Sequence, residues 1–119
     1  MNIEERYAFF IRHNRSCVVP NCENLPEPHH LRGKYLGGGV GCKPSEMTCI
    51  PLCRPHHDEL HTIGILTFEK RYGLDLIVEL IRCLSAFIYW LDKHLELHNW
   101  EKMLNCVRML EDLGYEVPR

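Results

Sequence analysis

The chain has 119 residues, of which 45% are hydrophobic and 25% are charged, and its formal net charge at pH 7 is -2. A chain of this length suits one domain that buries roughly two thirds of the surface exposed by its unfolded form. The net charge excludes a generally basic coat for nucleic acid, although it allows a local basic patch.

We expect neither a secretory signal nor a membrane span in this sequence. Its start, MNIEERYAFF, carries two glutamates and lacks the basic residues and long apolar run of a signal peptide, so we expect a cytoplasmic protein. The most apolar stretch, residues 74–91, is interrupted by Asp75, Glu79 and Arg82, which indicates a core helix rather than a bilayer span. We therefore expect no membrane partner.

Cysteine usage is the second compositional signal. Seven cysteines in a reducing compartment are more plausibly metal ligands and buried thiols than a disulfide framework, and an odd number cannot all pair within one chain. The segment between His30 and Arg54 is also locally basic, with four cations against the single acid Glu46. These cations are Arg32, Lys34, Lys43 and Arg54.

The N-terminal half is expected to form one helix and then two short strands. Residues 2–13 read as an amphipathic helix that Asn14 ends. Its apolar positions recur at helical spacing: Ile3, Tyr7, Phe10 and Ile11. Residues 16–55 carry Pro, Gly and Cys between two short apolar runs, HHL and TCIPL, which predicts two strands joined by a long loop.

Two short helices are expected next. Pro55 suits a first helical position and Gly64 suits a C-terminal cap, so a helix is predicted between them. A second short helix is predicted over residues 67–72, with Gly73 as its stop.

Apolar residues at intervals of three and four then mark a long amphipathic helix over residues 77–95. Another helix is expected from Asn99 to about Gly114, and the two should form an antiparallel hairpin joined near His98. Three roles are open for this hairpin: completing the core, forming a homodimer surface, or docking a partner. Cys83 and Cys106 fall on or beside the apolar stripes, so we interpret both as core thiols.

Two short-range ligand pairs predict a structural zinc site. Cys53 and His56 are spaced as C-x-x-H, and the stretch CVVPNC at residues 17–22 adds two cysteines at C-x4-C spacing. Both spacings suit tetrahedral zinc. The alternative is four ordinary buried residues, and Cys42 and Cys49 compete for a ligand position.

A second metal is indicated by the remaining histidines. On a helix, His57 and His61 are four residues apart and share a face, whereas His56 lies about 100° around the helix from His57. His29 and His30 are neighbours on a predicted strand, where their side chains point to opposite faces. One of them can then bind an ion while the other addresses a substrate.

The segment from residue 17 to residue 73 resembles a known family. The motifs HHLRG, a Gly-rich loop with KPSE, and IPLCRPHHDELH are similar in order and spacing to the HNH (ββα-metal) endonucleases. The likeness is to their phage and prophage branch, which is related to recombination-enhancement nucleases, and the H-x-x-x-H helix is as in colicin-type DNases. The resemblance implies an α+β fold with a zinc-stapled ββα-metal core, to which the N-terminal helix is added over residues 1–73. It does not extend to residues 74–119, which the apolar periodicity predicts as a helical hairpin packed on the same domain.

The resemblance also implies roles for individual residues. His30 would be the general base that deprotonates water for attack on a DNA phosphodiester, and one divalent cation (Mg2+, Mn2+, Ni2+ or Zn2+) would assist it. The ligands of that cation would be His29, His57 and His61, and those of the structural zinc would be Cys17, Cys22, Cys53 and His56. Arg32, Lys34, Lys43 and Arg54 are the candidate DNA contacts. The setting would be the cytoplasm of a bacterial or phage-infected cell.

One position departs from the family pattern. The family's middle asparagine is expected where this sequence has Thr48, within EMTCIPLC. In the family that residue helps to fix the base histidine through backbone contacts, and a hydroxyl serves this role less well. Weaker activity is the expected consequence.

The Gly-rich stretch YLGGGVG has two interpretations. Its backbone amides can cradle phosphate between Lys34 and Lys43, or its glycines simply supply the positive φ angles that the chain needs to turn back. It does not match the pattern of a nucleotide-binding P-loop.

Two rival functions are compatible with parts of the sequence. HDELH approaches the H-E-x-x-H motif of zinc proteases, but Asp58 has too short an arm to act as the base. His94 and His98, which could supply further ligands, are expected to face solvent. The other rival is a non-catalytic zinc module that binds DNA or a protein, which would carry the cysteine-rich site without a second ligand set.

Overall fold

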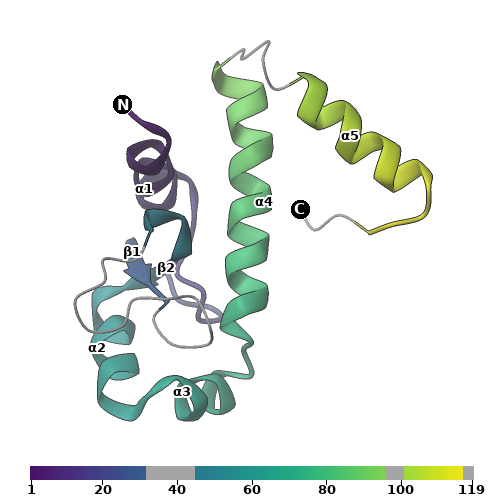
Figure 1. Ribbon diagram of the computed structural model, residues 1–119. Coiled ribbons are helices and arrows are strands. Elements are labelled where there is room, and N and C mark those ends of the chain that lie inside the picture. Colours follow the sequence, from purple (N-terminus) through teal and green to yellow (C-terminus); the bar gives the residue numbers. More distant parts are fainter. Residues whose placement is uncertain (32–44, 96–100, 117–119) are drawn as a thin grey trace.

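The computed structural model describes residues 1–31, 45–95 and 101–116, and the statements below concern those residues (Figure 1). The fold is α+β, as predicted, and it is mostly helical with one two-stranded antiparallel sheet. In chain order the elements are α1 (Ile3–Asn14), β1 (Pro26–His30), the 3-10 helix η1 (Glu46–Thr48), β2 (Cys49–Cys53), α2 (Arg54–Ile63), α3 (Ile65–Tyr72), α4 (Leu76–Leu95) and α5 (Glu101–Asp112). Among these residues, none of the helices is long and apolar enough to cross a membrane.

The first helix begins with a capping box. The side chain of Asn2 accepts a hydrogen bond from the Glu5 amide at 2.8 Å, and the Glu5 carboxylate accepts one from the Asn2 amide at 3.2 Å. Tyr7, Phe10 and Ile11 are buried as the periodicity predicts. The helix includes Asn14, so it ends one residue later than expected.

The two strands are shifted slightly from their predicted positions, and they are paired from Pro26 opposite Cys53 to His30 opposite Cys49. Both strands contain proline, which has no backbone N–H to donate to a neighbouring strand. Proline is tolerated here because each strand of a two-stranded sheet is an edge strand. The amide of Val18 donates to the carbonyl of Pro51 at 3.0 Å on the other edge of β2. This bond holds the segment after α1 beside the sheet.

Glycines separate the helices that follow the sheet. Gly64, at φ 82°, ends α2 and begins α3, and Gly73, at φ 65° in the left-handed region, ends α3. Both stops are as predicted. Pro55 occupies the second helical position rather than the first, because Cys53 caps the helix and Arg54 begins it.

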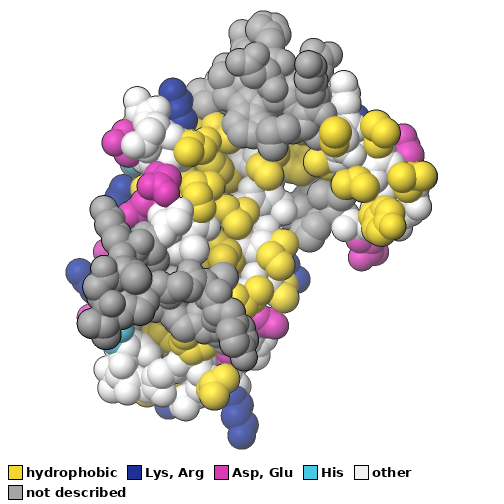
Figure 2. Space-filling model, viewed as in Figure 1, with side chains coloured by type: hydrophobic (Ala, Val, Ile, Leu, Met, Phe, Trp, Pro, Cys, Tyr) yellow, Lys and Arg dark blue, Asp and Glu magenta, His cyan; other side chains and the backbone are white. Residues whose placement is uncertain are grey.

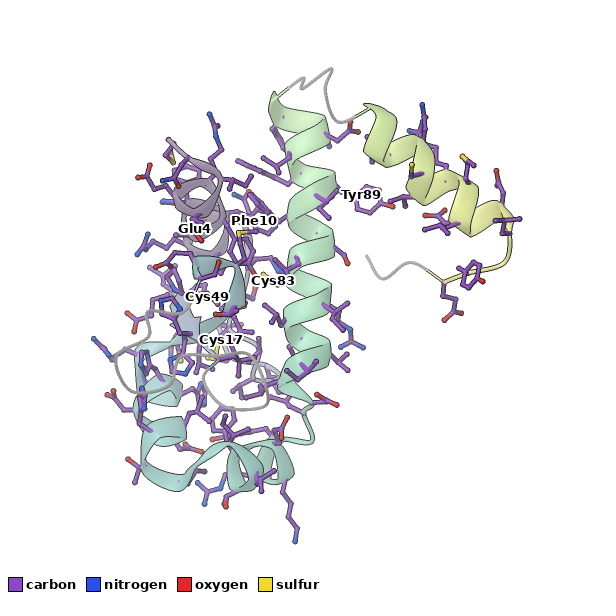
Figure 3. All side chains as sticks on the ribbon, viewed as in Figure 1. Glu4, Phe10, Cys17, Cys49, Cys83 and Tyr89 are labelled. Atoms are coloured by element: carbon purple, nitrogen blue, oxygen red, sulfur yellow. The ribbon has the colours of Figure 1, made fainter. Side chains whose placement is uncertain are left out.

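Helix α4 lies along both halves of the core. Leu76 and Leu80 pack with the sheet, α2 and α3, whereas Cys83, Phe87 and Leu91 pack with α1. Figure 3 shows Cys83 on the side of α4 that faces the sheet. The predicted core role of Cys83 is confirmed by its complete burial.

Helix α5 turns back from the end of α4 and diverges from it (Figure 1). Leu104 is buried, but Cys106 is exposed, so the prediction of a core thiol there is wrong. The diverging helix leaves that side chain uncovered. Hydrophobic residues remain exposed at this end of the chain (Figure 2) and include Met109, Leu110, Leu113 and Tyr115. The homodimer surface stays a prediction, and the junction at His98 lies outside the described residues.

Candidate metal centres

The structure brings Cys17, Cys22, Cys53 and His56 together, with all four ligand atoms within 4.8 Å of one another. The sulfurs of Cys22 and Cys53 are 3.7 Å apart, and Nδ1 of His56 lies 3.6 Å from the sulfur of Cys17 and 3.0 Å from that of Cys53. Tetrahedral zinc at ordinary bond lengths places two sulfurs about 3.8 Å apart and sulfur and nitrogen about 3.5 Å apart. The group could therefore hold a metal such as zinc.

Local structure explains how these four residues meet. The backbone hydrogen bond from Val18 to Pro51 places Cys17 beside β2. A tight turn that contains Asn21, at φ 64°, then brings Cys22 back toward β2. Asparagine is one of the residues that tolerate this left-handed conformation. Cys53 ends β2, and His56 lies in the first turn of α2, so the remaining pair comes from a single strand-to-helix junction.

The electrostatics of the sulfurs differ. Burial raises the pKa of Cys17 to about 12. Burial also acts to raise the pKa of Cys53, but hydrogen bonds from the backbone of His56 and from the side chains of Cys22, Cys17 and Asn24 outweigh it, so that this pKa is lowered. Cys53 is thus more easily converted than Cys17 to the thiolate that a metal requires.

A second group contains only imidazoles, from His29 on β1 and from His57 and His61 on α2. The Nε2 atoms of His57 and His61 lie 2.9 Å apart, and the ring of His29 lies edge-on to that of His57 with centroids 4.1 Å apart. The ligand atoms of all three are within 4.8 Å of one another. Two imidazole nitrogens on one tetrahedral zinc would be about 3.3 Å apart, so a small outward rotation of the two rings would admit an ion.

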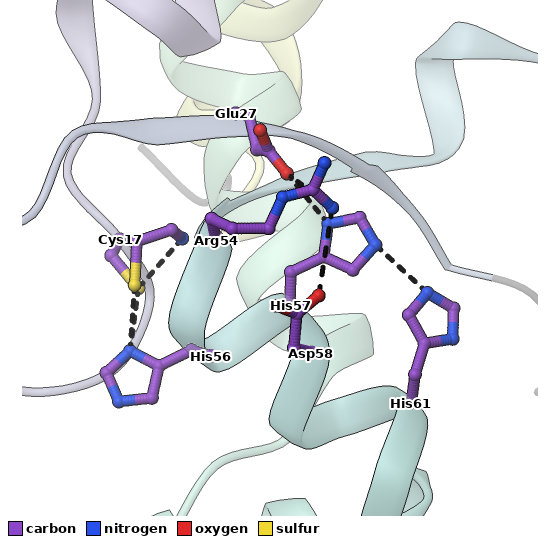
Figure 4. Close-up of polar contacts among 8 residues, drawn as sticks. Cys17, Glu27, Arg54, His56, His57, Asp58 and His61 are labelled. Carbon is purple, nitrogen blue, oxygen red and sulfur yellow. Dashed lines mark hydrogen bonds and ion pairs between the residues drawn. The ribbon is translucent and has the colours of Figure 1, made fainter.

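A carboxylate that the sequence reasoning missed orients this second group. Oε1 of Glu27 lies 2.9 Å from Nδ1 of His57 and 3.5 Å from the guanidinium of Arg54 (Figure 4). When Nδ1 of the neutral ring donates to Glu27, the lone pair is on Nε2, which is directed toward His61. Strand alternation could have identified Glu27, because Glu27 and His29 are two residues apart on β1 and therefore share a face.

The two groups do not share a histidine. His56 faces the cysteines, whereas its neighbour His57 faces His61, as their angular separation on the helix predicts (Figure 4). The rings of Phe68 and Tyr72 contact His56 from α3, with centroids at 6.5 and 5.4 Å. The first group is therefore partly enclosed by protein.

The imidazole group opens onto a cavity of about 460 Å³ that His30 also lines. The Nε2 atom of His30 lies 3.3 Å from Oε1 of Glu46. Its Nδ1 atom is buried and has no hydrogen-bond partner in the part of the chain that the structure describes. The cavity thus combines three converging imidazoles with a fourth histidine.

The other predicted site residues are placed as follows. The hydroxyl of Thr48 donates to the carbonyl of Ser45 at 2.7 Å, and the Thr48 carbonyl accepts from the Leu31 amide, next to His30. Cys49 lies with His30 and Glu46 rather than with the zinc-type ligands. Arg54 is largely exposed beside Glu27. Outside the described residues lie Arg32, Lys34, Lys43, Cys42 and the Gly-rich stretch.

Comparisons with known proteins give a family without an assigned activity. The model described as "Protein of unknown function (DUF968)" matches residues 2–88. "Uncharacterized protein YdfU" of Escherichia coli (strain K12) is 39% identical over 83 residues, which cover 66% of this chain and 22% of that protein. The chain thus spans about a fifth of the length of that relative. No solved structure matches. Both ligand groups lie within the range that the family model matches.

Proposed function

The chain belongs to the DUF968 family, whose name assigns no activity, and we propose that it is a metal-dependent endonuclease that hydrolyses DNA phosphodiester bonds. In this proposal His29, His57 and His61 hold one divalent cation, and His30 is the general base. The cysteine-rich group holds a structural zinc.

The observation that carries the proposal is the shared cavity of His30 and the three imidazoles. A structural zinc site uses four protein ligands, whereas a catalytic site keeps a position open for water or substrate. The cysteine-rich group has four ligands, and the imidazole group has three. This difference supports a structural role for the first group and a catalytic role for the second.

The residues of the cavity suit hydrolysis of a phosphodiester. When bound, the cation would polarise the phosphate and stabilise the leaving oxygen. His30 would accept a proton from water as the water oxygen attacks phosphorus and the bond to the leaving oxygen breaks. Histidine is the side chain that most often transfers a proton in such reactions.

The neighbouring residues have supporting roles. Glu27 keeps His57 in the tautomer that a cation needs, and the exposed guanidinium of Arg54 is available to a DNA phosphate. Thr48 supports His30 through the backbone, because its carbonyl holds the amide of Leu31. The side chain of Thr48 is already bonded to Ser45 and is not proposed to contact DNA.

The structural zinc would hold α2 against the sheet. Its ligands come from the segment after α1, from the end of β2 and from the first turn of α2, so one ion would fix three segments. A site of this type contributes roughly 10 kcal/mol or more of apparent folding free energy at neutral pH. The arrangement of two strands followed by α2 on the sheet supports the resemblance to the ββα-metal nucleases.

Nicking of supercoiled plasmid tests the proposal. The zinc-loaded protein is assayed with Mg2+, Mn2+ or Ni2+ beside the variants His30→Ala and His61→Ala. The exposed His94, on α4, provides the matched control His94→Ala. We expect metal-dependent nicking by the wild type and the control, with a loss of roughly 100-fold or more in His30→Ala.

The alternative function has its own outcome in the same assay. DNA binding with no cleavage by any variant or metal would contradict the nuclease and support a non-catalytic zinc module. Cleavage that His30→Ala retains in full would show that the base has been misassigned.

A further inference from the structure

His30 contacts a carboxylate through one nitrogen only. Its Nε2 atom lies 3.3 Å from Oε1 of Glu46, and its buried Nδ1 atom has no partner among the described residues. At this ion-pair distance an ionised carboxylate repels a nitrogen lone pair and attracts an N–H group, so the neutral ring is favoured with its proton on Nε2. The lone pair of the imidazole is then on Nδ1.

The other oxygen of Glu46 is held by a buried thiol. The sulfur of Cys49 lies 3.6 Å from Oε2, and Cys49 is fully buried. Burial, followed by the nearby carboxylate of Glu46, raises the pKa of this thiol well above its usual range. It therefore stays protonated at neutral pH and donates to the carboxylate.

The backbone under Glu46 is anchored from two sides. Ser45 caps η1 by accepting from the Met47 amide at 3.1 Å, and its hydroxyl donates to the carboxylate of Glu4 at 2.7 Å. The carbonyl of Cys49 accepts from the buried hydroxyl of Tyr7 at 2.7 Å. Helix α1 thus holds both ends of the segment that carries Glu46.

We propose that Glu46 is a positioning residue that fixes His30 in the tautomer with its proton on Nε2 and its lone pair on Nδ1, with Cys49 anchoring the carboxylate. The catalytic consequence rests on the proposed function, in which His30 is the base, and it requires that substrate binding admit the attacking water to the buried Nδ1 atom. The tautomer itself follows from the contacts and requires no activity.

The same three residues could instead form a third ligand group, because their ligand atoms lie within 4.8 Å of one another. The raised pKa and complete burial of Cys49 disfavour metal binding by this group, since a metal requires the thiolate. Metal content separates the two readings. A third ion that is lost in Cys49→Ser would overturn the proposal.

The direct test is the tautomer of His30, read from long-range proton–nitrogen correlations of the zinc-loaded full chain labelled with 15N-histidine. At about pH 8, where an ordinary histidine is neutral, we expect the proton of wild-type His30 on Nε2. Glu46→Ala should give a mixture of tautomers, and Glu46→Gln, whose amide oxygen can still accept, should restore the wild-type signal. Glu23→Ala is the control, because Glu23 is exposed.

Nicking rates complete the test. Glu46→Ala should slow cleavage by roughly 10- to 100-fold with both metal sites filled, and Glu46→Gln should recover part of the loss. A wild-type proton on Nδ1, or an unchanged tautomer in Glu46→Ala, would overturn the inference even if the protein cleaves DNA. A fixed tautomer in a protein that never cleaves DNA would support the inference and contradict the nuclease.

Discussion

His56 and His57 are adjacent on α2, yet their rings belong to different ligand groups. Nδ1 of His56 lies 3.0 Å from the sulfur of Cys53, whereas Nε2 of His57 lies 2.9 Å from that of His61. Successive residues on a helix point about 100° apart, so one turn can serve two centres. A metal in the first group would therefore fix the helix that carries two ligands of the second.

The two centres should differ in their effect on folding. We expect about two metal ions per chain in protein purified with zinc, measured by mass spectrometry of the metals. Cys22→Ser should remove one ion and lower the melting temperature strongly, because the structural zinc contributes folding free energy. His61→Ala should remove the other ion with a much smaller change in melting temperature. Equal destabilisation by both substitutions would contradict this division of roles.

The carboxylate of Glu27 should tune the imidazole site. Glu27→Gln retains the shape of the side chain but loses the charge beside Nδ1 of His57, so affinity for a divalent cation should fall by roughly 10- to 100-fold. Calorimetric titration of Mn2+ or Ni2+ into protein with a filled structural site measures this. Glu23→Gln, at an exposed position, is the matched control. An affinity equal to that of the control would show that Glu27 does not orient the ligand.

The hydroxyl of Tyr7 should stabilise the sheet. The hydroxyl donates to the carbonyl of Cys49 at 2.7 Å in the core. Tyr7→Phe leaves that buried carbonyl without this donor, so the unfolding free energy should fall by about 1 to 3 kcal/mol. Urea denaturation measures the change. Tyr115→Phe serves as the control because Tyr115 is 66% exposed, and it should leave stability unchanged. A Tyr7→Phe midpoint equal to that of the control would exclude the proposed contribution.

Buried thiols outside the metal sites should make the protein sensitive to alkali. Burial raises the pKa of Cys83 and of Cys49 above their ordinary value of about 9. The unfolded chain therefore releases these protons first, and the stability present below about pH 9 is lost as the pH rises toward the folded pKa values. Each thiol should contribute a loss of about 1.4 kcal/mol in unfolding free energy per pH unit.

The comparison of wild type with Cys83→Ala isolates one thiol, because the zinc-binding cysteines are common to both proteins. Denaturation between about pH 9 and 10 should give a shallower loss of stability in the variant, whatever its stability at neutral pH. Parallel pH dependences for the two proteins would contradict the assignment.

Much of the candidate site could be predicted from the sequence, because the geometry of a single helix or strand fixes which nearby residues share a face. His57 and His61 are four residues apart, and a helix has 3.6 residues per turn, so both lie on one face of the helix whatever the rest of the fold. The same holds for Cys53 and His56 in a C-x-x-H pair, and for the glycine stops of α2 and α3. Strand alternation likewise assigns His29 and His30 to opposite faces.

Contacts between distant segments required the tertiary structure. The register of β1 against β2 decides that Glu27 reaches His57 and that His30 lies beside Glu46, and no local spacing encodes that register. The divergence of α5 from α4 decides that Cys106 is exposed, although its position beside an apolar stripe suggested burial. Helical periodicity specifies which residues share a face, whereas burial depends on whether another element covers that face, which is a property of the folded chain as a whole.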